Sequence, residues 1–130
     1  MNVIKTYGRD GEQNGLVVPL WHTKDPIHID QVYLTTILPG KMKGPHLHKK
    51  RRGMFFCING GVLLVTRDIL NLYTTTWLQR GSKPAIVYPG TPAAIYNVGE
   101  TEAILLNMPS PPWLVEEQDE WPVENWDYEL

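Results

Sequence analysis

The sequence is poor in the features that mark membrane, secreted and nucleic-acid-binding proteins. Its single cysteine, Cys57, excludes a disulfide within the chain, which predicts a reducing, cytoplasmic location. No apolar run reaches the length of a membrane span, and the first residues lack the pattern of an export signal. The net charge is only −2 and the pI is near 6.0. We therefore expect neither a nucleic-acid partner nor a membrane partner.

The charges are nevertheless segregated along the chain. Six of the twelve Lys and Arg residues fall between Lys41 and Arg52, and seven of the fourteen Asp and Glu residues fall between Glu116 and Glu129. A basic segment this short favours a local anion-binding site, with a solvated loop as the alternative.

Helical periodicity is also missing, whereas turn residues recur through the chain. The eleven Gly and eleven Pro residues separate short runs rich in β-branched and aromatic side chains. This pattern predicts one all-β domain over residues 1–130, with a barrel core at about 16–108 and a C-terminal wrap at 109–130. The expected strands are Leu16–Trp21, Gln31–Leu38, Gly44–His48, Met54–Ile58, Val62–Arg67, Leu72–Leu78, Ala85–Tyr88, Ala93–Asn97 and Ala103–Met108.

Three local patterns add detail to this all-β prediction. The Asn59-Gly60 pair between two apolar runs predicts a β-hairpin. The run Gln31–Leu38 has no strongly polar face, so we expect a second sheet or a partner subunit to cover both faces. The segment after Pro109 is rich in Pro but also in Trp, so we expect it to wrap onto the barrel or onto a neighbour.

The segment Gly44-Pro45-His46-Leu47-His48 carries the strongest functional signal. Residues two apart in a strand point to the same face, so His46 and His48 are predicted to project together. Four cations, Lys49 to Arg52, follow directly. The pair indicates either a metal site or an acid/base site that holds an anionic substrate, and a purely structural pair is the remaining alternative.

A metal site needs three or four protein ligands. In metal-binding cupins, an acid follows the histidine pair and a third histidine lies in a second motif. Here those positions fall near Gly53 and at Ala93, and neither residue can bind a metal. We therefore expect no metal. A metal-dependent cupin that recruits His22 or His28 stays as a lesser alternative.

Three blocks of the sequence, 32–50, 55–68 and 97–109, resemble the dTDP-4-dehydrorhamnose 3,5-epimerase family, a metal-independent branch known as the RmlC-like cupins. The segment His46-Leu47-His48-Lys49 is also similar to one in sugar-nucleotide 3,4-ketoisomerases. The resemblance implies a cupin-type double-stranded β-helix, or jelly-roll barrel. It further implies a nucleotide-linked sugar as partner, no cofactor, and a homodimer.

The resemblance implies proton transfer by histidine on a dTDP-4-keto-deoxysugar, which makes the chain an epimerase or a ketoisomerase. His46 matches the base of the family, and His48 is its companion. The expected substrate-binding residues are Lys43, Arg51, Arg52, Tyr33 and Tyr96.

The sequence also departs from the family. A Lys of the epimerases falls near Gly53 or Met54, and their Tyr acid falls near Trp113. Tyr33, Tyr88 and Tyr96 are the candidates to replace that acid. These losses favour the main alternative, which is a catalytically degenerate cupin that binds a sugar nucleotide or another small anion without turnover.

Overall fold

The structure, a computed structural model, describes residues 3–114, 116 and 118–130, and these form strands, turns and extended segments. The described residues include no helix with the length and apolarity that crossing a bilayer requires. The strands are β1 Ile4–Tyr7, β2 Gln13–Val17, β3 Tyr33–Ile37, β4 Met42–Leu47, β5 Gly53–Asn59, β6 Gly61–Arg67, β7 Tyr73–Gln79, β8 Ala85–Val87, β9 Ala93–Tyr96, β10 Ala103–Asn107 and β11 Trp121–Pro122.

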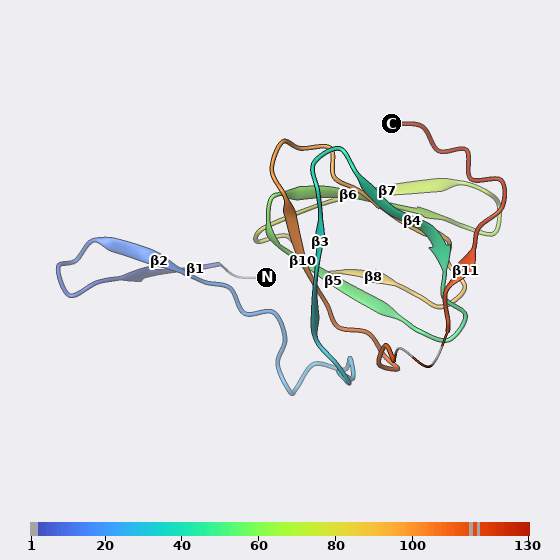
Figure 1. Cartoon of the computed structure of the whole chain (residues 1–130). Coiled ribbons are helices and arrows are strands. Elements are labelled where there is room, and N and C mark those ends of the chain that lie inside the picture. Colours follow the sequence, from blue (N-terminus) through green and yellow to red (C-terminus); the bar gives the residue numbers. More distant parts are fainter. Residues whose placement is uncertain (1–2, 115, 117) are drawn as a thin grey trace.

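Two antiparallel sheets form the body of the molecule (Figure 1). One has the strand order β3-β10-β5-β8, and the other has the order β11-β4-β9-β6-β7. Alternate residues of each strand turn inward, so Cys57 and Leu105 of the first sheet meet Leu64 and Ile95 of the second in one apolar core. The all-β prediction is confirmed, and most predicted strands are found within a few residues of their expected bounds.

The predicted hairpin at Asn59-Gly60 is wrong. Strand β5 pairs with β10 and β8, whereas β6 pairs with β9 and β7, so the turn carries the chain from one sheet to the other. Gly60 has a positive φ of 73°, and a Cβ there would lie 3.2 Å from the Glu102 carbonyl oxygen and from the Ala103 Cα. A tight turn of this composition fits a corner between sheets as well as a hairpin, and only the tertiary pairing distinguishes them.

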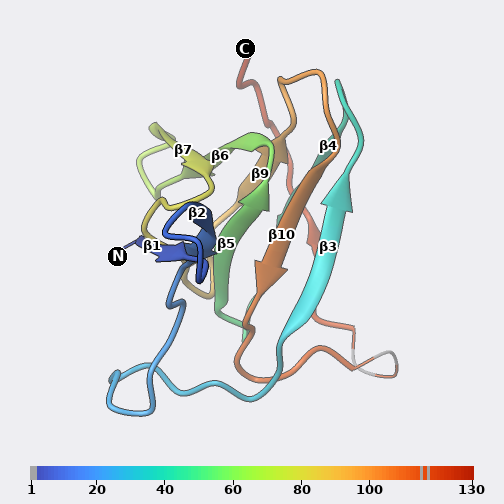
Figure 2. The ribbon, with the colours of Figure 1, turned by 90° about the vertical axis from the view of Figure 1, so that its left-hand side faces the viewer.

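The predicted strand Leu16–Trp21 is also wrong. Strand β2 ends at Val17, two residues before Pro19, which has no N–H to offer a sheet. Strand β2 instead pairs with β1 in a separate two-stranded sheet, and β1 was not predicted. This hairpin, residues 4–17, projects from the two-sheet body as an arm (Figure 1), which points toward the viewer in Figure 2.

The outer face of the four-stranded sheet is covered only in part. Met54, Phe56 and Met108 form a second apolar cluster, and Leu20, Ile27 and Ile29 of the N-terminal segment pack against it. Farther along the same face, Leu34 of the edge strand β3 stays 57% exposed. The expected cover over both faces of this strand is therefore incomplete within one chain.

The C-terminal segment lies against the chain's own barrel. Strand β11 pairs with β4, at the edge of the five-stranded sheet. Farther on, Trp126 and Tyr128 pack with Tyr73 and Tyr96 on the outer face of that sheet, and the Trp126 indole N–H donates to the Tyr96 hydroxyl at 2.9 Å. The segment thus forms one wall of the region around His46.

Candidate functional site

A cavity of about 530 Å³ lies between the two sheets and takes its lining from both sheets and from the C-terminal segment. The apolar part of the lining includes Phe55, Leu64 and Val87. Its titratable or hydrogen-bonding side chains include Tyr33, Lys43, His46, His48, Arg51, Asn107 and Glu120. A cavity with an apolar floor and a few converging polar groups is the usual form of a small-molecule site.

Both histidines face this cavity. The pairing of β4 with β9 shifts register between Lys43 and His46, and His48 follows the last residue of β4. The two imidazole rings meet edge to face, with their centroids 5.2 Å apart. The structure thus brings together the two rings that the sequence predicted to share a face.

The Arg51 guanidinium lies 2.6 Å from the Nε2 of His48. A guanidinium only donates hydrogen bonds, so this contact assigns the lone pair of His48 to Nε2 and its single ring proton to Nδ1. Burial, together with the positive charge of Arg51 and the neighbouring His46, lowers the pKa of His48 to about 4. His48 is therefore neutral at physiological pH.

His46 has a different partner. Its Nε2 lies 3.3 Å from the Oε1 of Glu120, a residue of the C-terminal segment. A carboxylate oxygen this close to Nε2 favours the tautomer of His46 that carries its proton on Nε2 and its lone pair on Nδ1. The sequence alone does not single out Glu120, because it is one of seven acidic residues after position 115 and no motif marks it. The two histidines are thus held in chemically different states.

Asp119, the neighbour of Glu120, fixes the C-terminal segment to the loop after β4. Its carboxylate accepts three successive backbone N–H groups, from Lys49 at 3.0 Å and from Lys50 and Arg51 at 2.9 Å. Burial acts to raise the pKa of Asp119, but these hydrogen bonds outweigh it and lower the pKa to about 2. This contact holds Glu120 close to His46 and Arg51 close to His48.

Tyr33 brings a phenol to the cavity, at the edge of the four-stranded sheet. The Nδ2 of buried Asn107 donates to the Tyr33 hydroxyl oxygen at 2.8 Å, and the Oδ1 of Asn107 accepts the Met54 N–H. Among the described residues no group accepts the Tyr33 O–H, so this O–H can donate into the cavity. The Lys43 ammonium lies nearby and donates to the Thr35 hydroxyl.

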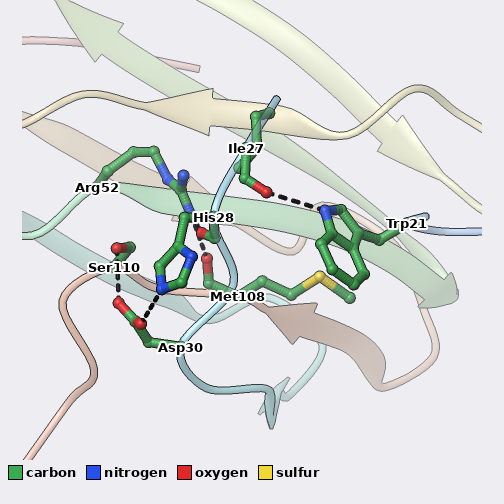
Figure 3. A network of polar contacts seen from close by, with 7 residues as sticks. All are labelled: Trp21, Ile27, His28, Asp30, Arg52, Met108 and Ser110. Atoms are coloured by element: carbon green, nitrogen blue, oxygen red, sulfur yellow. Dashed lines mark hydrogen bonds and ion pairs between the residues drawn. The ribbon is translucent and has the colours of Figure 1, made fainter. Parts of the chain in front are cut away.

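Two of the residues expected to bind substrate lie outside this cavity. Tyr96 points to the opposite face of its strand, because Ile95 takes the inward position. Arg52 turns toward the N-terminal segment, where its guanidinium donates to the carbonyls of His28 and Met108 (Figure 3). The structure therefore does not bring Tyr96 and Arg52 together with the two histidines at the cavity.

The remaining candidates are placed as follows. Tyr88 and Trp113 line the cavity, and the Trp113 ring stacks on Tyr33 with centroids 6.3 Å apart. Ala93 lines it as well, at the position where a third histidine would stand. His28 instead pairs with Asp30 at 2.6 Å (Figure 3) and does not belong to the lining of the cavity.

Three possible metal ligands do meet in the cavity. One ligand atom each of His46, His48 and Glu120 lie within 4.8 Å of one another. Two histidines and a carboxylate are a recognised donor set for transition metals. Neither His22 nor His28 belongs to this group among the described residues, and the third possible ligand is Glu120.

Comparison with known proteins places the chain in a family. Residues 2–120 match the family model described as FdtA, WxcM-like, C-terminal. The chain belongs to this family. No curated protein sequence matches the chain.

Proteins of known structure share its fold at low sequence identity. A dTDP sugar isomerase from Desulfovibrio desulfuricans is 15% identical over 94% of this chain and 80% of its own, with a TM-score of 0.77. The sugar 3,4-ketoisomerase QdtA from Thermoanaerobacterium thermosaccharolyticum, crystallised in complex with TDP, is 22% identical over 95% of this chain and 88% of its own, with a TM-score of 0.71. The expected relation to RmlC-like cupins and the cupin-type fold are confirmed.

A larger protein carries a similar domain. The capsular polysaccharide assembling protein CapF from Staphylococcus aureus is 18% identical over 73% of this chain, with a TM-score of 0.67. The chain covers 26% of the length of CapF.

Proposed function

We propose that this member of the FdtA family is a sugar-nucleotide 3,4-ketoisomerase that acts on a nucleotide-linked 4-keto sugar. The observation that carries the proposal is the pair of imidazoles at one cavity, one paired with a carboxylate and the other with a guanidinium. The ketoisomerase is favoured over the epimerase because relatives of the same fold are 3,4-ketoisomerases.

His46 is the base in this proposal. A C–H bond beside a carbonyl is weakly acidic, and the Nδ1 lone pair of neutral His46 takes its proton. The electrons of that bond move to the carbonyl oxygen and give an enolate. The carboxylate of Glu120, whose Oε1 lies 3.3 Å from Nε2, stabilises the imidazolium that forms.

Tyr33 is the acid. Its O–H donates to the enolate oxygen, and the resulting phenolate keeps the hydrogen bond from Asn107. The product is an enediol. The Tyr33 phenolate then takes the proton of the neighbouring hydroxyl, whose oxygen becomes the new carbonyl. His46 returns its proton to the former carbonyl carbon, so both residues regain their starting states with no net change in protons.

Cations around the base hold the negative oxygens. Lys43 and Arg51 line the same cavity as His46 and carry charges opposite to those of a sugar nucleotide. Arg51 uses only part of its five N–H donors on His48, so others are available to an anionic oxygen.

Turnover tests the proposal directly. The protein is incubated with dTDP-4-keto-6-deoxyglucose, and the sugar is followed by NMR spectroscopy for movement of the carbonyl from C4 to C3. We expect conversion by the unchanged protein and its loss in His46→Asn. His22→Asn is the matched control, because His22 is exposed and lies outside the cavity, and it should keep full activity.

Binding without turnover is the second candidate function. It is favoured by Ala93 and Trp113, which stand in the cavity where the family resemblance predicts a histidine and a tyrosine acid. Calorimetry with TDP beside the turnover assay distinguishes the two. Tight binding with no conversion of the keto sugar selects the binding function.

We also infer that two copies of the chain associate. An isolated two-stranded sheet is marginally stable in water, yet the arm stands away from the body (Figure 1). Its cross-strand partners Ile4 and Val17 are both exposed. The outer face of β3 exposes Leu34, and the outer edge of this strand has no partner among the described residues. A second copy whose arm packs on this surface would cover both the arm and the exposed part of β3.

A further inference from the structure

We propose that His46, His48 and Glu120 form a latent transition-metal site, and that Arg51 prevents a metal ion from binding there. Two imidazoles and one carboxylate form the donor set that binds iron, zinc and related ions in proteins. Bonds of roughly 2.0–2.2 Å to one ion keep its ligand atoms within about 4.4 Å of one another. Since the three ligand atoms already lie within 4.8 Å, small side-chain movements bring them onto one ion.

Arg51 makes both nitrogens of His48 unavailable. The Nε2 lone pair accepts a hydrogen bond from the guanidinium at 2.6 Å, and the single proton of the ring is then on Nδ1. A metal ion needs a free lone pair on one of them. To bind, it must displace a guanidinium that cannot lose its own proton, and must approach its positive charge at close range.

The backbone of Arg51 is fixed independently of its side chain. The Arg51 N–H donates to the Asp119 carboxylate at 2.9 Å, as do its two predecessors. The guanidinium therefore reaches His48 from a backbone that is held in place. The same anchor holds Glu120, so replacing only the side chain of Arg51 leaves the three ligands in place.

By keeping a metal ion away from the histidines, Arg51 preserves the proton chemistry of the site. The inference on metal binding does not depend on the proposed reaction. An ion bound to His46 would occupy the lone pair that a base requires. The guanidinium supplies positive charge to the cavity and leaves that lone pair free.

The test is Co²⁺ binding to Arg51→Met, with protein purified without a His tag and no sugar present. Calorimetry gives the affinity, and the visible absorption of bound Co²⁺ reports histidine and carboxylate ligation. We expect one Co²⁺ per chain in Arg51→Met, bound about 100-fold more tightly than by the unchanged protein, a change at the upper end of what neighbours of a metal site produce. Arg51→Leu is the second variant if Arg51→Met fails to fold.

Two controls locate the effect. Lys43→Met removes another cation from the cavity lining without touching His48, and it should bind Co²⁺ no better than the unchanged protein. Adding Glu120→Gln or His46→Asn to Arg51→Met should abolish the tight binding. Equal affinities in the unchanged protein and Arg51→Met, or binding that survives the loss of both Glu120 and His46, would overturn the proposal.

Discussion

At the scale of residues, the site depends on the different partners of two similar side chains. His46 faces a carboxylate and His48 faces a guanidinium, although the two rings are only 5.2 Å apart. A carboxylate stabilises a positively charged ring, and a guanidinium opposes one. The pair is thereby divided into a base that can accept a proton and a neutral neighbour that does not compete for it.

The first prediction concerns the titration of His48. Its ring should stay neutral from pH 7 to pH 5, because its pKa is about 4. In Arg51→Met the pKa should rise but stay below its usual 6.5, since burial is the larger cause of the shift. NMR titration of the ring nitrogens measures both values. A pKa near 6.5 in the unchanged protein would contradict the contact with Arg51.

The same shift has a consequence for stability. The unfolded chain takes up this proton near pH 6.5, whereas the folded chain takes it up only near pH 4. His48 therefore lowers the free energy of unfolding progressively as the pH falls between these values. Denaturant titrations across this range should show a smaller dependence on pH in Arg51→Met.

The second prediction concerns the acid. Tyr33→Phe removes the phenolic O–H but keeps a ring against Trp113, so kcat should fall about 100-fold or more while KM changes little. The loss of the acceptor for Asn107 should cost about 1 kcal/mol of stability. Steady-state kinetics with Tyr88→Phe as the comparison tests the assignment. A larger loss of kcat in Tyr88→Phe would move the role of acid to Tyr88.

At the scale of elements, the C-terminal segment is a wall of the site. Strand β11 adds to β4, the Asp119 carboxylate binds the loop after β4, and the Lys49 ammonium lies 3.8 Å from the centre of the Trp121 ring. Glu120 lies between these contacts and reaches His46 from them. An acidic residue that is 61% exposed is thus held in place by its neighbours.

The third prediction tests this anchor. Asp119→Ala should cost about 1–2 kcal/mol of stability, because three N–H groups lose a charged acceptor. It should also lower kcat to the level of Glu120→Gln, because Glu120 leaves His46. Asp68→Ala is the matched control: the Asp68 carboxylate accepts two N–H groups in a turn outside the cavity. Equal activity in Asp119→Ala and Asp68→Ala would exclude a positioning role for Asp119.

The pH dependence of this anchor has a defined sign. The folded-state pKa of Asp119 is about 2, below its ordinary 3.8. Its stabilising contribution is therefore present in full above about pH 4 and is lost as the pH falls toward 2.

The elements also show which features the sequence could predict. Alternation within a strand is local, so Val62–Arg67 and Ala103–Met108 were predicted close to their observed bounds. Which sheet a strand joins is not decided locally, so the Asn59-Gly60 pair predicts a hairpin that the structure does not contain. The arm escaped prediction because Ile4–Tyr7 is short and buries little.

The same distinction applies to the site. His46 and His48 could be placed together from their spacing alone, and Lys43 and Arg51 lie close by in sequence. Glu120 could not, because its contact with His46 spans more than seventy residues and depends on the pairing of β11 with β4. Whether Tyr96 faces the cavity depends on which alternate residues of its strand turn inward, and the sequence alone does not show this.

At the scale of the whole molecule, one chain leaves two apolar surfaces open. The arm exposes Ile4 and Val17 as a cross-strand pair, and the four-stranded sheet exposes Leu34 at its edge. Exposed apolar patches on elements that lack a partner indicate association. The molecule that we propose to act in solution is therefore a pair of chains.

The fourth prediction tests that association. The double substitution Ile4→Asp with Val17→Asp should weaken the dimer at least about 100-fold, because each buried Ile or Val contributes about 1.5–3 kcal/mol. Lys5→Glu, on the opposite face of the arm, is the control and should leave the dimer intact. Sedimentation over a range of concentrations gives the dissociation constant. A monomeric unchanged protein at micromolar concentration would contradict the inference.

The central claim is that His46 moves a proton at a sugar carbon. The most direct measurement is deuterium incorporation from D₂O into dTDP-4-keto-6-deoxyglucose, read by mass spectrometry on the recovered sugar. The cavity reaches solvent beside the exposed Glu120, so a proton held on His46 exchanges with the medium. Deuterium should appear at the carbon next to the carbonyl with the unchanged protein and not with His46→Asn. A sugar that binds but returns without deuterium, or equal incorporation in both proteins, would contradict the account.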